Sequence, residues 1–227
     1  MEMPRVKKKI IVNTLSLSEA HRLIEVSRDT EIAAPVFLAL NFGLRRSEAC
    51  GLKWSAVNIA GKNLHVKSTI VYEGGKPIES IPKTEKSDRI IPIGDDQLDF
   101  FIKLKKQQEK DKDYYGNTYD DNDYICRYQD GKVMKPEYVS KHFAKLLKKN
   151  GFTPLRFHDL RHSFASLYMN EAGGNIKILQ ELLGHGQIET TSAIYTHIDN
   201  TPKQQAINNM SRLLNQRADT ASDETAG

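Results

Sequence analysis

The chain has 227 residues, of which 39% are hydrophobic, and a formal net charge of +4. These values suit one soluble domain with a sizeable core, and no apolar run approaches the ~20 residues that span a bilayer. The basic N-terminus lacks the apolar region of a signal peptide. Cys50 and Cys126 form no metal-type cluster, and two thiols in a chain of this size suit a reducing cytosol.

The charge is unevenly distributed along the chain. Residues 95–130 have a net charge of −4 and residues 218–227 a net charge of −3, so the remainder carries +11. A basic body with acidic outlying segments favours a polyanionic partner. An ordinary mixed surface explains the charge alone equally well.

The N-terminal part of the chain is predicted to be helical. Residues 1–15 are interpreted as a linker or a ragged end. Residues 17–27 and 31–53 carry apolar side chains at helical spacing, and Ser16 or Ser18 is the candidate cap of the first helix.

Residues 57–93 contain β-type residues separated by glycine-rich and polar turns, which predict a small antiparallel sheet. The strands predicted at 78–81 and 89–93 flank a polar turn at 83–88. This arrangement predicts a hairpin with Lys83 at its tip.

The C-terminal part is again predicted to be helical. Residues 96–110 have helical spacing, whereas residues 111–123, rich in Asp, Asn, Tyr and Gly, predict a surface loop. Pro136 suits the first turn of the next helix. Further helices are predicted at 158–171, 175–183, 189–197 and 203–217. The last ten residues are predicted to be disordered.

The helix that starts at Pro136 carries a stripe of lysines. Lys141, Lys145 and Lys148 are spaced i, i+4, i+7 and so share one face, where they could track a phosphate backbone. A solvated lysine face is the alternative.

A dense polar motif, H-D-L-R-H, begins at His158. His158 and Arg161 share a helix face and suit a phosphate, because a guanidinium grips its oxygens in a fork and an imidazole adds a donor. His158 and His162 also resemble the zinc-protease motif H-E-x-x-H. Against zinc, Asp159 replaces the longer glutamate, and His185 is the one possible third ligand.

Two further cationic residues stand at positions that suggest chemistry. Arg45 ends an apolar helical run and needs a partner, which Glu48 could provide, although a surface ion pair is the simpler reading. Lys83 in a hairpin could place an ammonium over a leaving oxygen, or it could be a solvated turn lysine.

The last two candidates lie close together in sequence. His185 stands between two glycines after a predicted helix, and Tyr195 follows ten residues later. A phenol with a pKa near ~10 is a poor nucleophile unless cations and a base assist it. Each residue alone is most simply a surface or packing residue.

The order of these motifs is more specific than any one of them. G-L-R-R-S-E, K-T, H-D-L-R-H, L-L-G-H and Y-T-H follow one another as in the tyrosine recombinases, and the chain most resembles integrases of phages and integrative elements. One departure is Phe42, where the family usually has threonine. The residues that match the family's catalytic set are Arg45, Lys83, His158, Arg161, His185 and Tyr195.

The resemblance implies a role for each residue. Arg45 and Arg161 would clamp the scissile phosphate, and Lys83 would act as general acid toward the leaving 5′-oxygen. Tyr195 would attack the phosphorus and form a 3′-phosphotyrosyl link. The two histidines, His158 and His185, would assist by proton transfer and hydrogen bonding.

Glu48 would support the catalytic set, and DNA contacts are predicted for Arg89 and the three lysines. Preplaced arginines stabilise the charge of a phosphorane transition state, and side chains handle both protons, so neither a metal nor another cofactor is predicted. The covalent link conserves the phosphodiester energy, and the sequence has no G-x-x-x-x-G-K-[ST] loop for ATP.

The implied fold is mainly α (α+β), a helical catalytic domain with a small antiparallel sheet. It would comprise residues 16–202, and residues 203–217 would form a helix that contacts a neighbouring subunit. The expected partners are double-stranded DNA and other recombinase subunits, four in the synaptic complex, in the cytoplasm of a bacterial or phage-infected cell. No membrane association is predicted.

About fifteen residues precede the first helix, whereas relatives usually carry a core-binding domain there. The chain is thus interpreted as truncated or as a minimal enzyme, with weak, salt-sensitive DNA binding. Three alternatives stay open: a type IB topoisomerase-like nicking and closing enzyme, a DNA-binding fragment inactive alone, and a zinc hydrolase.

Overall fold

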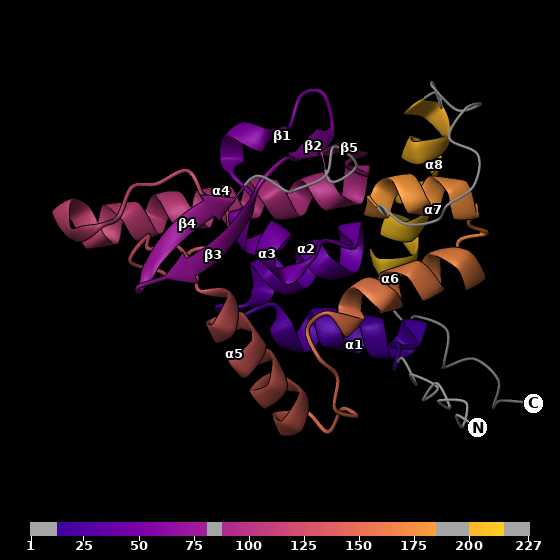
Figure 1. Ribbon diagram of the computed structural model, residues 1–227, viewed down its shortest axis with the longest axis horizontal. Helices are drawn as coiled ribbons and strands as arrows, with labels where there is room; N and C mark the ends of the chain where they lie inside the picture. Colours follow the sequence, from indigo (N-terminus) through magenta and orange to yellow (C-terminus); the bar gives the residue numbers. More distant parts are fainter. Residues whose placement is uncertain (1–12, 81–87, 185–199, 216–227) are drawn as a thin grey trace, which may run out of the picture.

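The computed structural model describes residues 13–80, 88–184 and 200–215 (Figure 1). Helices dominate this part of the chain, and none of those described is long and apolar enough to cross a membrane. The helices are α1 (Leu17–Ser27), α2 (Ala33–Phe42), α3 (Arg46–Gly51), α4 (Asp95–Tyr115), α5 (Pro136–Lys149), α6 (Asp159–Asn170), α7 (Ile176–Leu183) and α8 (Asn200–Asn215). The strands are β1 (Val57–Asn58), β2 (Asn63–Val66), β3 (Thr69–Glu73), β4 (Lys76–Ser80) and β5 (Arg89–Pro92). The predicted mainly helical fold with small antiparallel sheets is confirmed.

The first helix starts where its sequence predicts. Ser16 Oγ accepts a hydrogen bond from the backbone N–H of Glu19 at 3.3 Å, and the Glu19 carboxylate accepts one from the Ser16 N–H at 2.8 Å. This reciprocal pair satisfies two N–H groups that a helix start leaves without partners. Ser16, not Ser18, is therefore the cap.

Helix α2 is the centre of the molecule, with α1, α3, α6 and α8 packed around it (Figure 1). Its residues from Ala34 to Phe42 are all buried. A helix that is apolar on all sides belongs inside a core, because no face of it favours contact with water. The elements that carry the polar side chains described below, α3 and α6, pack directly against it.

The prediction of one helix over 31–53 was wrong, because the chain turns at Gly43. Gly43 has φ +62° and ends α2 in the left-handed conformation, which suits glycine. A Cβ there would lie 2.5 Å from Leu183 Cδ2 and 2.8 Å from Phe164 Cδ1. The turn starts a separate helix, α3, and places Arg45 at its N-cap.

Replacing Gly43 with alanine is expected to lower the free energy of unfolding more than the same change at Gly74. Both residues have positive φ, which costs a residue with a Cβ about 1–2 kcal/mol, but Gly74 has nothing within 4 Å of an added Cβ. The clash with Leu183 and Phe164 adds about 1–3 kcal/mol at Gly43. Urea denaturation of both variants measures the difference, and equal losses would contradict the packing argument.

The strands form two separate sheets, so the predicted hairpin at 83–88 was wrong. Strand β4 pairs with β3, whereas β5 pairs with β2 in a three-stranded sheet of order β1-β2-β5. The tight turn lies instead at Gly74 and Gly75, which both have the positive φ that such turns favour. Residues 81–87, including Lys83, lie outside the described residues.

Helix α4 is longer than its sequence predicts. It continues to Tyr115, and a 3₁₀ turn, Gly116–Thr118, follows, so the loop predicted at 111–123 was partly wrong. Asp and Lys side chains on its exposed faces keep its C-terminal end solvated, which made the sequence read as a loop. Helix α5 begins at Pro136 as predicted.

Helix α8 packs against the chain's own core. It contacts α1, α2, α4, α7 and β5, and its buried apolar residues are Ala206, Ile207, Met210 and Leu214. The apolar stripe that was expected to face a neighbouring subunit is thus covered within this chain, because it completes the core beside α2. Contact of residues 203–217 with a neighbouring subunit stays a prediction. The helix predicted at 189–197 lies outside the described residues.

Candidate active site

Four segments of the chain bring polar side chains together beside the start of α3. The loop before α3 supplies Arg45, α3 supplies Glu48, β5 supplies Arg89 and α6 supplies Arg161. These four residues are here called the arginine cluster. Glu48, Arg89 and Arg161 are buried.

Glu48 is the shared acceptor of the arginine cluster. Its Oε1 accepts from Arg45 Nη1 at 2.7 Å and from Arg89 Nη1 at 3.2 Å. Its Oε2 accepts from the Arg45 backbone N–H at 2.8 Å and from Arg89 Nη2 at 3.0 Å, and Arg161 Nη1 lies 3.8 Å away. A carboxylate has about four lone-pair sites, so the four hydrogen bonds from Arg45 and Arg89 saturate the Glu48 carboxylate.

The electrostatics of the arginine cluster favour an added anion. Burial opposes ionisation of Glu48, but the hydrogen bonds and charges of Arg89 and Arg45 outweigh it and lower its pKa to about 2. Glu48 is therefore a carboxylate at neutral pH. One carboxylate faces three guanidinium groups, which leaves an excess of two positive charges for a bound anion such as a phosphate.

Arg161 is the innermost arginine that could face a ligand, with a side chain 3% exposed. It donates from Nη1 to the Gly43 carbonyl at 2.7 Å and from Nη2 to the Leu183 carbonyl at 2.5 Å. Burial, followed by the charge of Arg45, lowers its pKa to about 9. Desolvation and the neighbouring Arg45 guanidinium thus both oppose the positive charge of Arg161, and Glu48 offsets them in part.

Arg45 is the open member of the arginine cluster, with 35% of its side chain exposed. Its guanidinium is tied to Glu48 through one nitrogen, while its backbone N–H holds the same carboxylate. This double attachment orients the side chain and leaves guanidinium donors that can reach a ligand from solvent.

His158 stands at the N-cap of α6, one helical turn before Arg161. Burial lowers its pKa, and the charges of His162, Arg161 and Arg45 lower it further, so the imidazole is neutral at pH 7. A neutral imidazole can accept a proton on one nitrogen while it donates from the other. The structure thus places Arg45, Glu48, His158 and Arg161 near one another, and their catalytic roles stay predictions.

The second reading of this helix, a zinc site, gains no support from Asp159. Both Asp159 oxygens accept hydrogen bonds from Arg156, at 2.8 Å for the Nη2 bond, so the carboxylate is already paired. The rings of His158 and His162 lie 5.2 Å apart, edge to face. Over residues 13–80, 88–184 and 200–215, no group of three or more potential ligand side chains is placed to hold a metal ion.

The prediction that Arg89 contacts DNA was wrong, because its side chain is only 6% exposed. The guanidinium points inward to Glu48, and Nε donates to the Leu182 carbonyl at 2.7 Å. The sequence contained one signal of this: Arg89 directly precedes two isoleucines in a strand whose alternate positions are buried. A residue in phase with Ile91 faces the core.

The three lysines predicted to contact DNA, Lys141, Lys145 and Lys148, are exposed on α5. The opposite face of α5 is buried, and Arg46 on α3 donates to Ser140 at 2.6 Å, which attaches α5 next to the arginine cluster. Figure 1 shows α5 running from below α3 toward the edge of the molecule. DNA contact by these lysines stays a prediction.

The remaining predicted site residues, Lys83, His185 and Tyr195, lie outside the described residues. The elements that flank these residues in the sequence are described: β4 precedes and β5 follows residues 81–87, and α7 precedes and α8 follows residues 185–199. Strand β5 contributes Arg89 to the arginine cluster, and the last residues of α7 accept hydrogen bonds from Arg89 and Arg161.

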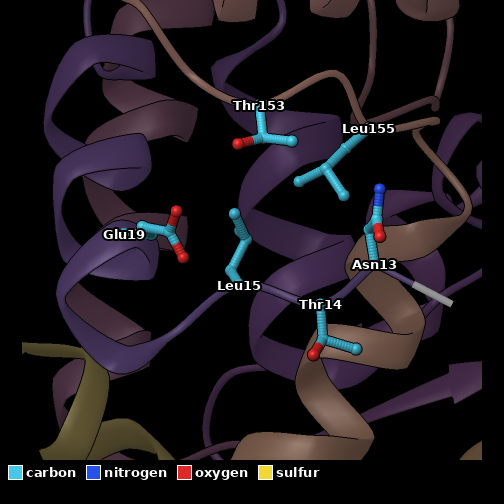
Figure 2. A pocket seen from close by; sticks show the side chains of 6 residues that line it. All are labelled: Asn13, Thr14, Leu15, Glu19, Thr153 and Leu155. Atoms are coloured by element: carbon cyan, nitrogen blue, oxygen red, sulfur yellow. The ribbon is translucent and has the colours of Figure 1, made fainter. Parts of the chain in front are cut away.

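A separate pocket lies away from the arginine cluster, between the start of α1 and the loop before α6. Figure 2 shows Glu19 and Leu15 on one side of it and Thr153 and Leu155 on another. Its one charged side chain, Glu19, is already used in the cap of α1. None of the predicted site residues lines this pocket.

The family model of the phage integrase family matches residues 13–201. The chain therefore belongs to the phage integrase family, and the resemblance to tyrosine recombinases is confirmed. A tyrosine recombinase XerC-like protein of Caldanaerobacter subterraneus is 30% identical in an alignment of 223 residues, and the match covers 93% of this chain and 57% of that protein. Tyrosine recombinase XerA of Pyrococcus horikoshii is 31% identical over 91% of this chain and 64% of its own length.

Solved structures show the same fold. The Tn1549 transposon integrase, in complex with transposon right end DNA, superposes with a TM-score of 0.68 at 22% identity, over 86% of this chain and 65% of that chain. The chain spans less than two thirds of the length of these relatives.

Proposed function

We propose that the chain is the catalytic part of a site-specific DNA recombinase that cuts and rejoins duplex DNA through Tyr195. The observation that carries the proposal is the buried carboxylate Glu48, shared by two guanidiniums, with a third nearby. Such a surplus of fixed cations suits a phosphodiester whose charge increases in the transition state. The two neighbouring groups that would bind it are Arg45 from the solvent side and Arg161 from the interior.

The proposed reaction is a transesterification without a metal ion or ATP. The Tyr195 oxygen attacks the phosphorus and loses its proton, the bond to the 5′-oxygen breaks, and Lys83 protonates that oxygen. His158, neutral at pH 7, is suited to accept or relay the tyrosine proton, with His185 as the second hydrogen-bonding group. Reversal by a 5′-hydroxyl from another duplex rejoins the strands. The proposed assembly on DNA is a tetramer.

The test is a denaturing gel of the chain mixed with a nicked suicide duplex, which traps the covalent intermediate. We expect a protein–DNA adduct that survives EDTA and is absent with Tyr195→Phe, because phenylalanine has no attacking oxygen. An adduct that persists in Tyr195→Phe would show that another residue is the nucleophile, and loss in EDTA would support the zinc alternative. A two-site exchange assay then separates a recombinase from a nicking and closing enzyme.

A further inference from the structure

Arg89 makes contacts that the proposed reaction does not yet explain. Strand β5 places it next to Glu48, to which it donates two parallel hydrogen bonds in a fork. Its Nε donates in addition to the carbonyl of Leu182, in the last turn of α7. One guanidinium thus joins three elements, α3, α7 and its own strand.

Stability alone does not account for a third arginine here. Glu48 already has an ion-pair partner in Arg45, and the charge of Arg89 contributes to lowering the pKa of Arg161. Buried like charges cost free energy unless another role retains them. The arrangement therefore indicates a positional role.

Two arginines donate hydrogen bonds to the carbonyls of two consecutive residues at the end of α7. Arg89 binds the Leu182 carbonyl and Arg161 binds the Leu183 carbonyl, after which Gly184 ends the helix with φ +64°. Cations at the last carbonyls of a helix satisfy acceptors that have no partner in the helix and interact favourably with its dipole. The position of α7 is thus coupled to the same guanidinium that holds Glu48.

We propose that Arg89 is a positioning residue of the strand-cleavage reaction. It fixes Glu48, and through Glu48 the guanidinium of Arg45, and it sets the end of α7 at a constant distance from Arg161. Arg89 itself touches no DNA. This inference rests on the proposed function, because it assigns how the two phosphate-binding arginines of that reaction are kept in place.

Lysine cannot replace Arg89 in this role. The observed bonds use three nitrogens of one planar group, in directions that reach both Glu48 oxygens and a carbonyl on the other side. A lysine ammonium would keep the charge and could bind Glu48, but it would lose the fork and the link to α7. The Arg89→Lys variant therefore separates geometry from charge.

The test compares Arg89→Lys with Arg127→Lys in the suicide-duplex assay, with DNA affinity measured by fluorescence anisotropy. Arg127 is the matched control, because it is a partly buried arginine that also forks onto neighbours, Asn122 and Gln108, away from the arginine cluster. At saturating DNA, we expect Arg89→Lys to form adduct about a hundredfold more slowly, as small misplacements of catalytic groups do. Its Kd should stay within about threefold of that of the unmodified chain, because the Arg89 side chain is only 6% exposed and would make no contact with DNA.

A double-mutant cycle tests whether Arg89 acts through Glu48. Residues that act as one unit are not additive, so the double variant Arg89→Gln/Glu48→Gln should cleave no more slowly than Glu48→Gln alone. The double variant also removes both buried charges together, so it decides the question if Arg89→Lys fails to fold.

Three results would overturn the inference. They are unchanged cleavage by folded Arg89→Lys, a rate loss matched by Arg127→Lys, and a multiplicative loss in the double variant. A parallel loss of DNA affinity and cleavage would instead assign Arg89 to DNA contact. Absence of adduct with the unmodified chain would count against the proposed function itself, which keeps the two failures distinct.

Discussion

The Glu48→Ala variant is expected to lose about 3–5 kcal/mol of unfolding free energy, the usual cost of breaking a buried ion pair from one side. Glu48 has 1% of its side chain exposed and is the shared partner of Arg45 and Arg89, with Arg161 at 3.8 Å. Its removal leaves two buried guanidiniums facing each other and a third at the surface. Urea denaturation at pH 7 measures the loss.

A matched control is Glu79→Ala, which breaks the Lys53–Glu79 pair. That pair has a distance of 2.6 Å, but 40% of the Glu79 side chain is exposed. An exposed pair contributes about 0–1 kcal/mol, because water and salt screen it. The argument from burial fails if the two alanine variants lose the same amount.

The pH dependence follows from the lowered pKa of Glu48. Its folded pKa of about 2 lies below its ordinary value of 4.5, so its contribution is complete above pH 4.5 and is lost as the pH falls toward 2. The unmodified chain should lose stability over this window, and Glu48→Gln should lose less. Parallel curves for the two proteins would mean that Glu48 does not titrate as its contacts imply.

The second large effect is expected for Arg45→Ala, which should slow adduct formation by about a hundred- to a thousandfold at saturating DNA. This is the usual cost of removing one preplaced donor to a transition-state oxyanion. Arg45→Lys should also be slow, because an ammonium cannot donate to Glu48 and a phosphate in one plane. Quenched-flow sampling of the suicide-duplex reaction gives the rates.

Arg45→Ala should change the unfolding free energy far less than Glu48→Ala. The charge of Arg45 lowers the pKa of Arg161, so its removal relieves repulsion while Arg89 still pairs with Glu48. We expect the unfolding free energy of Arg45→Ala to lie within about 1 kcal/mol of that of the unmodified chain, because the Arg45 side chain is 35% exposed and a solvent-exposed ion pair contributes about 0–1 kcal/mol.

Arg46→Ala is the control for Arg45, since Arg46 is the next residue and donates to Ser140 instead of Glu48. Its rate should fall by less than about tenfold, a cost of about 1.4 kcal/mol. Equal rate losses at both positions would mean that the cleavage assay reports the general basic charge of α3. A difference of at least tenfold would support a specific role for Arg45.

Local signals predicted several elements correctly. Ser16 and Glu19 cap α1, and Pro136 starts α5, because both effects depend on residues within one helical turn. The pairing of Arg45 with Glu48 was also predictable, since three residues separate them. The order of motifs further predicted the family, which the comparisons confirmed.

Signals that depend on distant residues were missed. Phe164 and Leu183 leave no room for a side chain at Gly43, and β5 pairs with β2 instead of β4. The residues next to Gly43 and β5 in the sequence do not determine this packing or this strand pairing, because both depend on the whole core.

By itself, the sequence determined the mainly helical class, the family and the residue types of the site, because helix caps, hydrophobic periodicity and motif order are local or ordered along the chain. Only the tertiary structure decided that Arg89 turns inward and that its guanidinium shares Glu48 with Arg45. The contact between Arg89 and Glu48 joins residues that are 41 positions apart in the chain. A charged side chain can be buried there only because packing of α3, β5 and α7 supplies its acceptors.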